Sequence, residues 1–153
     1  LDAARWDIPA GRMKMKTPHI VPLSVQAVNL LRTLHLISGH SAMLFPGERD
    51  HEKCMSNNTI LKALERMGYK GRMTGHGFRG VASTLLHEKG YKSELVERQL
   101  SHGERNKVRK AYNRAQYLEE RRDMMRQWGE YLSALEQGGK VIPINQRKGA
   151  KPN

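Results

Sequence analysis

Five residues of this chain carry side chains that can act together on a phosphate group. Tyr112 offers a phenolic hydroxyl, which is a nucleophile once it loses its proton. His76 and Arg79 are three residues apart, so a helix would place them on one face. His102 follows twenty-three residues after Arg79, Tyr112 ten residues later, and Lys14 lies far upstream. Since arginine can hold two phosphate oxygens and histidine titrates near neutrality, the set is suited to chemistry on an anionic group.

The charge balance indicates the kind of partner. The 153 residues include 27 Lys and Arg against 15 Asp and Glu, which gives a net charge of +12. Basic side chains placed on phosphates release condensed counterions, so a nucleic acid is the expected partner. An RNA-binding basic protein would share this charge. However, only 6% of the residues are aromatic and they form no stacking motif, which argues against it.

Two short extended segments precede the helical part of the chain. Trp6–Pro9 is the first, and Ala10-Gly11 predicts a turn after it. Pro18–Leu23 is the second, with proline at its margins, as suits an edge strand. We expect a small antiparallel sheet near the start, with the basic stretch Arg12–Lys16 near its turn.

Helical periodicity dominates the remainder, so we expect an α+β fold that is mostly helical. Ser24 can cap the first helix. The helices are predicted over residues 25–37, from 56 to a stop at Gly68, from after Thr74 to near Gly90, and over 93–100, 105–112 and 118–135. Apolar residues keep the helical spacing along the first two helices: Val28, Leu31, Leu34, Ile60, Leu61, Leu64 and Met67. In the later helices, the residues expected in the core are Val81, Leu85, Leu86, Met124, Met125, Trp128 and Leu132.

Residues 1–136 are expected to form one domain. Residues 137–153 are rich in Gly, Pro, Lys and Asn and hold no acid, so we predict a disordered basic tail there. The single cysteine, Cys54, cannot form an internal disulfide, which suits a reducing cytoplasm. No apolar run approaches the length of a membrane span. The remaining histidines lack paired metal-ligand spacing, so no metal site is expected.

The order Lys, His-x-x-Arg, His, Tyr resembles that of the tyrosine recombinase, or phage integrase, family. The likeness covers about residues 6–132 and looks like that of integrases from prophages and satellite phages of enterobacteria. It extends to the words Arg12-Met13-Lys14, Pro18-His19-Ile20-Val21-Pro22-Leu23-Ser24, Thr74-Gly75-His76-Gly77-Phe78-Arg79 and Arg105-Asn106-Lys107-Val108-Arg109. A lone His-x-x-Arg pair is a weak signal, whereas the ordered set at these spacings is specific.

The resemblance implies a role for each of the five residues. Tyr112 would attack a DNA phosphodiester and become a 3′-phosphotyrosine. Arg79, His76 and His102 would stabilise the charge on the five-coordinate phosphorus. Lys14 would protonate the departing 5′ oxygen. A 5′ hydroxyl of another strand would reverse the reaction, so neither a metal nor a nucleotide cofactor is expected.

The same resemblance implies double-stranded DNA at attachment sites as the partner. Basic residues near the predicted site are expected to contact the DNA backbone: Arg12, Lys16, Arg105, Lys107, Arg109, Lys110 and Arg114. A homo-tetramer on DNA, an excisionase or host DNA-bending proteins as accessory partners, and a place in the bacterial cytoplasm at the nucleoid are further implications. No membrane partner is expected.

Two departures from the family pattern matter. The family carries another catalytic arginine before the sheet, in a Gly-x-Arg-x-x-Glu-like word. We expect no such word in this chain, which starts just after the place where one is expected. We therefore expect a fragment that lacks this arginine together with the arm-binding and core-binding domains. The step from His102 to Tyr112 is also one residue longer than the usual spacing.

Two other interpretations stay open. A DNA-binding remnant would hold its site without cutting, and the missing arginine favours it. A type IB topoisomerase would use similar chemistry, but the short spacings and the local words favour an integrase.

Overall fold

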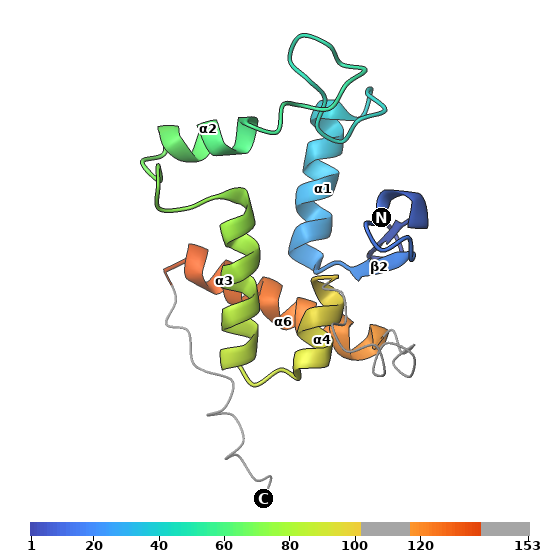
Figure 1. Ribbon diagram of the computed structural model, residues 1–153, viewed down its shortest axis with the longest axis vertical. Coiled ribbons are helices and arrows are strands. Elements are labelled where there is room, and N and C mark those ends of the chain that lie inside the picture. The colour runs from blue at the N-terminus through green and yellow to red at the C-terminus, as the bar shows by residue number, and fades with distance from the viewer. Residues whose placement is uncertain (102–116, 139–153) are drawn as a thin grey trace, which may run out of the picture. The chain divides into compact units, whose positions relative to one another are not determined.

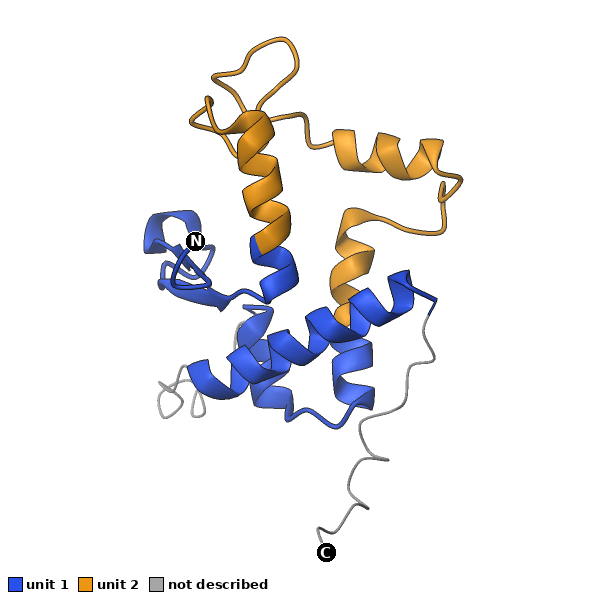
Figure 2. Cartoon of the chain, turned by 180° about the vertical axis from the view of Figure 1, so that it is seen from behind, with its two compact units in different colours: residues 1–28, 83–153 blue, residues 29–82 orange. Residues whose placement is uncertain are grey.

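The computed structural model describes residues 1–101 and 117–138 (Figure 1). Over these residues the chain forms five α-helices, a short 3-10 helix and a two-stranded antiparallel sheet, which confirms the mostly helical α+β expectation. The chain divides into a first unit, residues 1–28 and 83–153, and a second unit, residues 29–82 (Figure 2). The helix predicted over residues 105–112 and all but the first two residues of the predicted tail lie outside the described residues.

The sheet of the first unit is a hairpin. Strand β1 (Arg5–Ile8) pairs antiparallel with strand β2 (His19–Pro22). Between the strands, the 3-10 helix η1 (Ala10–Arg12) is followed by a turn in which Lys16 N donates a hydrogen bond to Met13 O at 3.0 Å. Both predicted extended segments are therefore confirmed to within one residue at each end.

Three helices supply the core of the first unit. Helix α4 (Ser93–Gln99) and helix α6 (Leu118–Glu136) pack together and enclose a side chain from the end of helix α3 (Gly75–Glu88). Four apolar side chains form the buried centre: Leu86, Leu95, Val96 and Met124. Five partly buried side chains surround it: Tyr91, Leu100, Tyr117, Met125 and Trp128. Because burial of a side chain of this size contributes about 1.5–3 kcal/mol, this cluster holds the three helices together.

A glycine lets α6 approach the start of helix α1 (Val25–Ser38). Ser24 is buried, and its Oγ accepts a hydrogen bond from Ala27 N at 3.2 Å, which confirms Ser24 as the predicted cap. A Cβ atom added to Gly129 would lie 2.8 Å from Ser24 Oγ and would also overlap the side chain of Gln26. The approach of the two helices therefore requires a residue without a side chain at position 129.

The second unit contains the rest of α1, helix α2 (Thr59–Arg66) and the first turns of α3. Ser38 is buried at the end of α1, with its Oγ 3.0 Å from Leu44 O, so the hydroxyl ties the helix end to the following loop. An isolated bridge between Pro46 and Cys54 closes that loop. Gly68, with φ +83°, ends α2 as predicted.

The structure corrects two expectations about the helices. Helix α2 begins at Thr59 and not at Ser56, because Ser56 Oγ accepts from Asn58 N at 3.3 Å and forms a local turn instead of a cap. Val28, Leu64, Leu86 and Met124 are buried as expected. Val81 and Leu132, which were predicted to be core, are exposed instead, and so are Ile60, Leu61 and Met67 of the predicted apolar face. Periodicity identified their apolar faces but could not say whether another element covers them.

We expect Gly129→Ala to lower the free energy of unfolding by about 1–3 kcal/mol, because the added methyl group overpacks the contact with Ser24. The measurement is urea denaturation followed by circular dichroism. Gly80→Ala is the matched control: Gly80 also lies inside a helix, but its Cβ would meet nothing within 4 Å. That variant should be more stable by up to about 1 kcal/mol, since alanine is the better helix former. Equal effects of the two substitutions would contradict the close approach at Gly129.

Candidate functional site

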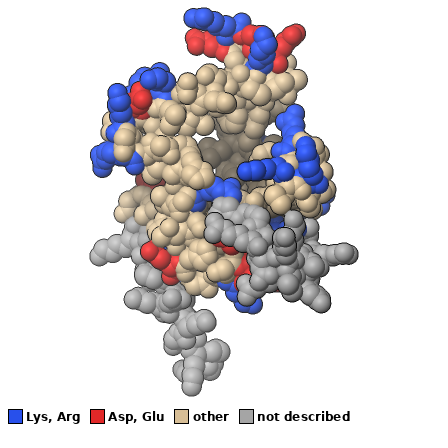
Figure 3. Space-filling view, viewed as in Figure 1, with Lys and Arg blue, Asp and Glu red and all other residues tan. Residues whose placement is uncertain are grey.

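Lys14 lies on the exposed connection between β1 and β2. It follows η1 and precedes Lys16, whose φ of +52° makes the turn back toward β2. Arg12, Lys14 and Lys16 are all exposed, and no acidic residue occurs in the sequence between Asp7 and Glu48. In Figure 3, basic side chains gather over the hairpin at the right of the view without acidic ones among them. The connection thus presents positive charge to solvent, which favours an anionic ligand.

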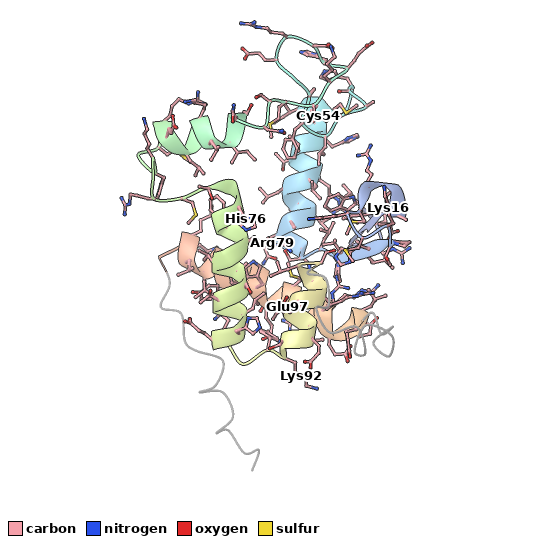
Figure 4. All side chains as sticks on the ribbon, viewed as in Figure 1. Lys16, Cys54, His76, Arg79, Lys92 and Glu97 are labelled. Carbon is pink, nitrogen blue, oxygen red and sulfur yellow. The ribbon has the colours of Figure 1, made fainter. Side chains whose placement is uncertain are left out.

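His76 and Arg79 lie on the first turns of α3, one helical turn apart (Figure 4). Thr74 caps this helix, since its Oγ1 accepts from Gly77 N at 3.0 Å. The pair is therefore at a helix N-terminus and on one face, as predicted. His76 is exposed, and Arg79 is half-buried and already engaged in an interaction. A helix N-terminus favours negative charge, so this end of α3 is suited to a phosphate.

The described structure places the predicted catalytic residues in two groups. Lys14 belongs to the first unit, whereas His76 and Arg79 belong to the second. His102 and Tyr112 fall in residues 102–116, outside the described residues. The same holds for five of the residues predicted to contact DNA: Arg105, Lys107, Arg109, Lys110 and Arg114.

Two residues next to helices α4 and α6 have left-handed backbone. Ser101, two residues after the end of α4, has φ +53°. Tyr117, immediately before α6, has φ +48°. Tyr117 is half-buried and packs against the core cluster, as expected for the start of a packed helix.

A buried arginine connects the elements next to these two residues. Arg121, on the first turn of α6, is fully buried. Its Nε donates to Gln99 Oε1 at 3.0 Å, and its Nη2 donates to Ile20 O at 2.6 Å. His19 Nε2 lies 3.4 Å from Gln99 O and adds a second link between β2 and α4. Burial, and next the positive charge of Arg98, lower the pKa of Arg121 to about 10.

Sequence reasoning missed Arg121, which stands in the charged run Glu119 to Arg122. Such a run is usually a solvated helix face. One signal was present: Tyr117, Arg121, Met124 and Trp128 recur at helical spacing, so Arg121 occupies the apolar stripe of α6. A charged residue at a core position of that stripe could have been identified from spacing alone.

The expectation that this chain contains no Gly-x-Arg-x-x-Glu word is wrong, because these letters occur at Gly47–Glu52. They belong to the loop between α1 and α2, where Asp50 pairs with Lys53 at 2.7 Å. This loop follows the sheet, whereas the family's arginine word is expected before it. The match therefore does not supply the arginine that the family pattern requires.

Three other kinds of feature can be assessed over the part of the chain that the structure describes: metal ligands, the cysteine and membrane-spanning helices. No group of three His, Cys, Asp or Glu side chains is placed to hold a metal ion there. Cys54 is exposed, with its Sγ 3.5 Å from Met43 Sδ. Among residues 1–101 and 117–138, no helix is long and apolar enough to cross a membrane.

Comparison with known proteins gives a consistent result. The profile of the phage integrase family matches residues 1–119. Prophage integrase IntA of Escherichia coli is 40% identical, over 92% of this chain and 34% of that protein. The integrase of Enterobacteria phage P4 is 48% identical, over 86% of this chain and 34% of that protein. Prophage integrase IntZ of Escherichia coli is 46% identical, over 88% and 33% respectively.

The chain spans about a third of the length of these relatives. No solved structure shows a significant match. The family match covers every one of the five residues singled out by type and spacing, from Lys14 to Tyr112. This chain belongs to the phage integrase family.

Proposed function

We propose that residues 1–136 form the catalytic domain of a tyrosine-type site-specific recombinase that integrates and excises a phage or other mobile element. The observation that carries this proposal is the ordered set from Lys14 to Tyr112 in a member of the integrase family. Two placements support it: Lys14 on an exposed basic turn, and the His76–Arg79 pair at a capped helix N-terminus. Both are locations that can receive a DNA phosphate.

In the proposed first step, Tyr112 Oη attacks the phosphorus of a DNA phosphodiester, and one of the two histidines accepts the phenolic proton. Arg79 and the histidines stabilise the negative charge that builds on the non-bridging oxygens. The bond from phosphorus to O5′ breaks as Lys14 Nζ gives that oxygen a proton. The products are a 3′-phosphotyrosine and a free 5′ hydroxyl.

The second step is the reverse reaction with a different strand. The 5′ hydroxyl of that strand attacks the phosphotyrosine, Lys14 takes up the hydroxyl proton, and Tyr112 leaves and regains its own. Since the ester keeps the energy of the broken phosphodiester, no nucleotide is consumed. One cleavage step and one rejoining step together therefore return the residues to their starting protonation states.

The proposed partner is double-stranded DNA at attachment sites. The exposed Arg12 and Lys16 flank Lys14 and would contact the backbone on either side of the cleaved phosphate. The five basic residues between Arg105 and Arg114 would do the same around Tyr112. A homo-tetramer on DNA, an excisionase or host DNA-bending proteins, and a cytoplasmic place at the nucleoid complete the proposal.

The isolated chain should bind duplex DNA weakly, with little sequence preference and a steep dependence on salt, because its +12 charge acts mainly on phosphates. We expect the affinity to fall at least about tenfold between about 50 and 200 mM salt, measured by fluorescence anisotropy. An affinity that does not change over this range would contradict a backbone-dominated mode of binding.

Strand cleavage by the complete protein should proceed in EDTA and without ATP. Arginine, lysine and histidine supply the positive charge that a metal ion would otherwise bring to the phosphate. The measurement is the yield of covalent protein–DNA complex with and without Mg²⁺. A strict requirement for Mg²⁺ in this step would rule out the proposed mechanism.

Tyr112, and not Tyr117, should become joined to DNA. Arg109, Lys110 and Arg114 surround Tyr112 in sequence and would favour its phenolate, whereas Tyr117 packs against the core at the start of α6. The complete protein is given a nicked suicide substrate, and the DNA-linked peptide is mapped. Tyr112→Phe should abolish the covalent complex and leave DNA binding nearly unchanged.

The matched variant Tyr117→Phe should still form the complex. If it loses the complex while Tyr112→Phe retains it, the nucleophile is Tyr117. Binding without cleavage by the unaltered complete protein would instead point to a DNA-binding remnant.

A further inference from the structure

We propose that Arg121 is a positioning residue for DNA cleavage: it fixes the β1–β2 hairpin, and with it Lys14, against the ends of α4 and α6. This inference rests on the proposed function, because Lys14 is there the group that protonates O5′. It adds a residue that the ordered set does not contain. In this proposal Arg121 acts through the position of Lys14 and not by binding the phosphate.

The guanidinium group of Arg121 has a geometry that can join two elements. A planar fork with donors in fixed directions can hold two acceptors at a set angle. Among the described residues, Arg121 donates to the side chain of Gln99, the last residue of α4, and to the backbone of Ile20 in the middle of β2. Three elements therefore meet at one fully buried side chain. His19, next to Ile20, links β2 to the same end of α4.

Lys14 is attached to the rest of the first unit through the β1–β2 hairpin. Its connection is held by short-range bonds, from Arg12 N to Pro9 O at 3.0 Å and from Met13 N to Ala10 O at 3.1 Å. Strand β1 pairs with β2, and β2 packs against α6. The hairpin thus moves with β2, and the bond from Arg121 to Ile20 O is part of what holds β2 in place.

The end of α4 and the start of α6 are both close in sequence to proposed catalytic residues. Gln99 is three residues before His102, and Arg121 is nine residues after Tyr112. Arg121 thus joins β2, α4 and α6, the strand and the two described α-helices that are nearest in sequence to Lys14, His102 and Tyr112. A change in this contact would alter where Lys14 lies relative to the end of α4 and the start of α6.

Packing does not require a charge at position 121. The side chain occupies the apolar stripe of α6, where methionine would fill a similar volume, and such replacements of buried ions are often tolerated. The lowered pKa agrees with a charge held away from water. We therefore expect Arg121→Met to fold while losing both directed hydrogen bonds.

The test uses the complete protein and two nicked suicide substrates. One has an ordinary scissile phosphate, and the other has sulfur in place of the bridging 5′ oxygen. Sulfur departs as a thiolate without a proton, so this substrate does not need Lys14. Arg121→Met is compared with Arg122→Met, a control one residue along the same helix that is exposed and pairs with Glu119 at 2.6 Å.

Arg121→Met should cleave the ordinary substrate about ten- to a hundredfold more slowly, which is the loss expected for a misplaced acid. It should cleave the sulfur substrate at close to the wild-type rate, with unchanged DNA affinity. A general loss of structure would slow both substrates, so the difference between them reports the position of Lys14. Arg122→Met should cleave both normally.

Wild-type cleavage of the ordinary substrate by Arg121→Met, or equal slowing on both substrates, would overturn the inference. If Arg121→Met does not fold, Gln99→Leu removes one acceptor and leaves the bond to Ile20. It should show a smaller slowing confined to the ordinary substrate, and any other pattern overturns the inference.

Lys14→Ala separates this inference from the proposed function. If sulfur restores cleavage by Lys14→Ala but not by Arg121→Met, only the positioning role fails. If sulfur does not restore cleavage by Lys14→Ala, the proposed role of Lys14 fails and the inference fails with it.

Discussion

The guanidinium group of Arg121 is the contact on which the first unit depends. It joins residues separated by 101 positions in the sequence, since Ile20 lies in the hairpin and Arg121 in the last helix. Burying a cation away from water is unfavourable unless its donors are satisfied, and each donor bond therefore constrains its acceptor strongly. The apolar cluster stabilises the packing of α3, α4 and α6, but the hydrophobic effect does not fix their relative orientation. The arginine adds direction, because its bonds are satisfied only when strand and helices are in register.

Lys14, His76 and Arg79 occur in local structures that suit their proposed roles. A lysine that gives up a proton benefits from a neighbourhood without carboxylates, and the hairpin connection provides one. An arginine and a histidine that hold a phosphate benefit from the free N–H groups at a helix start, and the cap by Thr74 fixes where α3 begins. The basic hairpin connection, the start of α3 and the core contact of Arg121 thus each contribute in a different way to the proposed binding of an anion.

Much of this could be predicted from sequence, for identifiable reasons. The hairpin, the cap at Ser24 and the stop at Gly68 depend on local preferences of proline, serine and glycine, which act over a few residues. Ser56 was predicted wrongly because a serine can bond its own turn as readily as it caps a helix. Met67 is 63% exposed because helical spacing defines an apolar face but not its neighbour. Arg121 was missed because a charge usually indicates solvent, and only tertiary contacts reveal an exception. The roles of Lys14, His76, Arg79, His102 and Tyr112 remain predictions that rest on their order and on the family.

Ser101, which follows α4, and Tyr117, which precedes α6, both have left-handed backbone conformations. A residue other than glycine in this conformation costs roughly 1–2 kcal/mol, so local preference alone would not select it. Ser101 is held by a bond from its N to Arg98 O at 3.1 Å, and Tyr117 by packing against the core. The directions in which the chain leaves α4 and enters α6 are therefore set by tertiary packing. A substitution in the core, remote from any phosphate, can in this way change the directions in which the chain leaves α4 and enters α6.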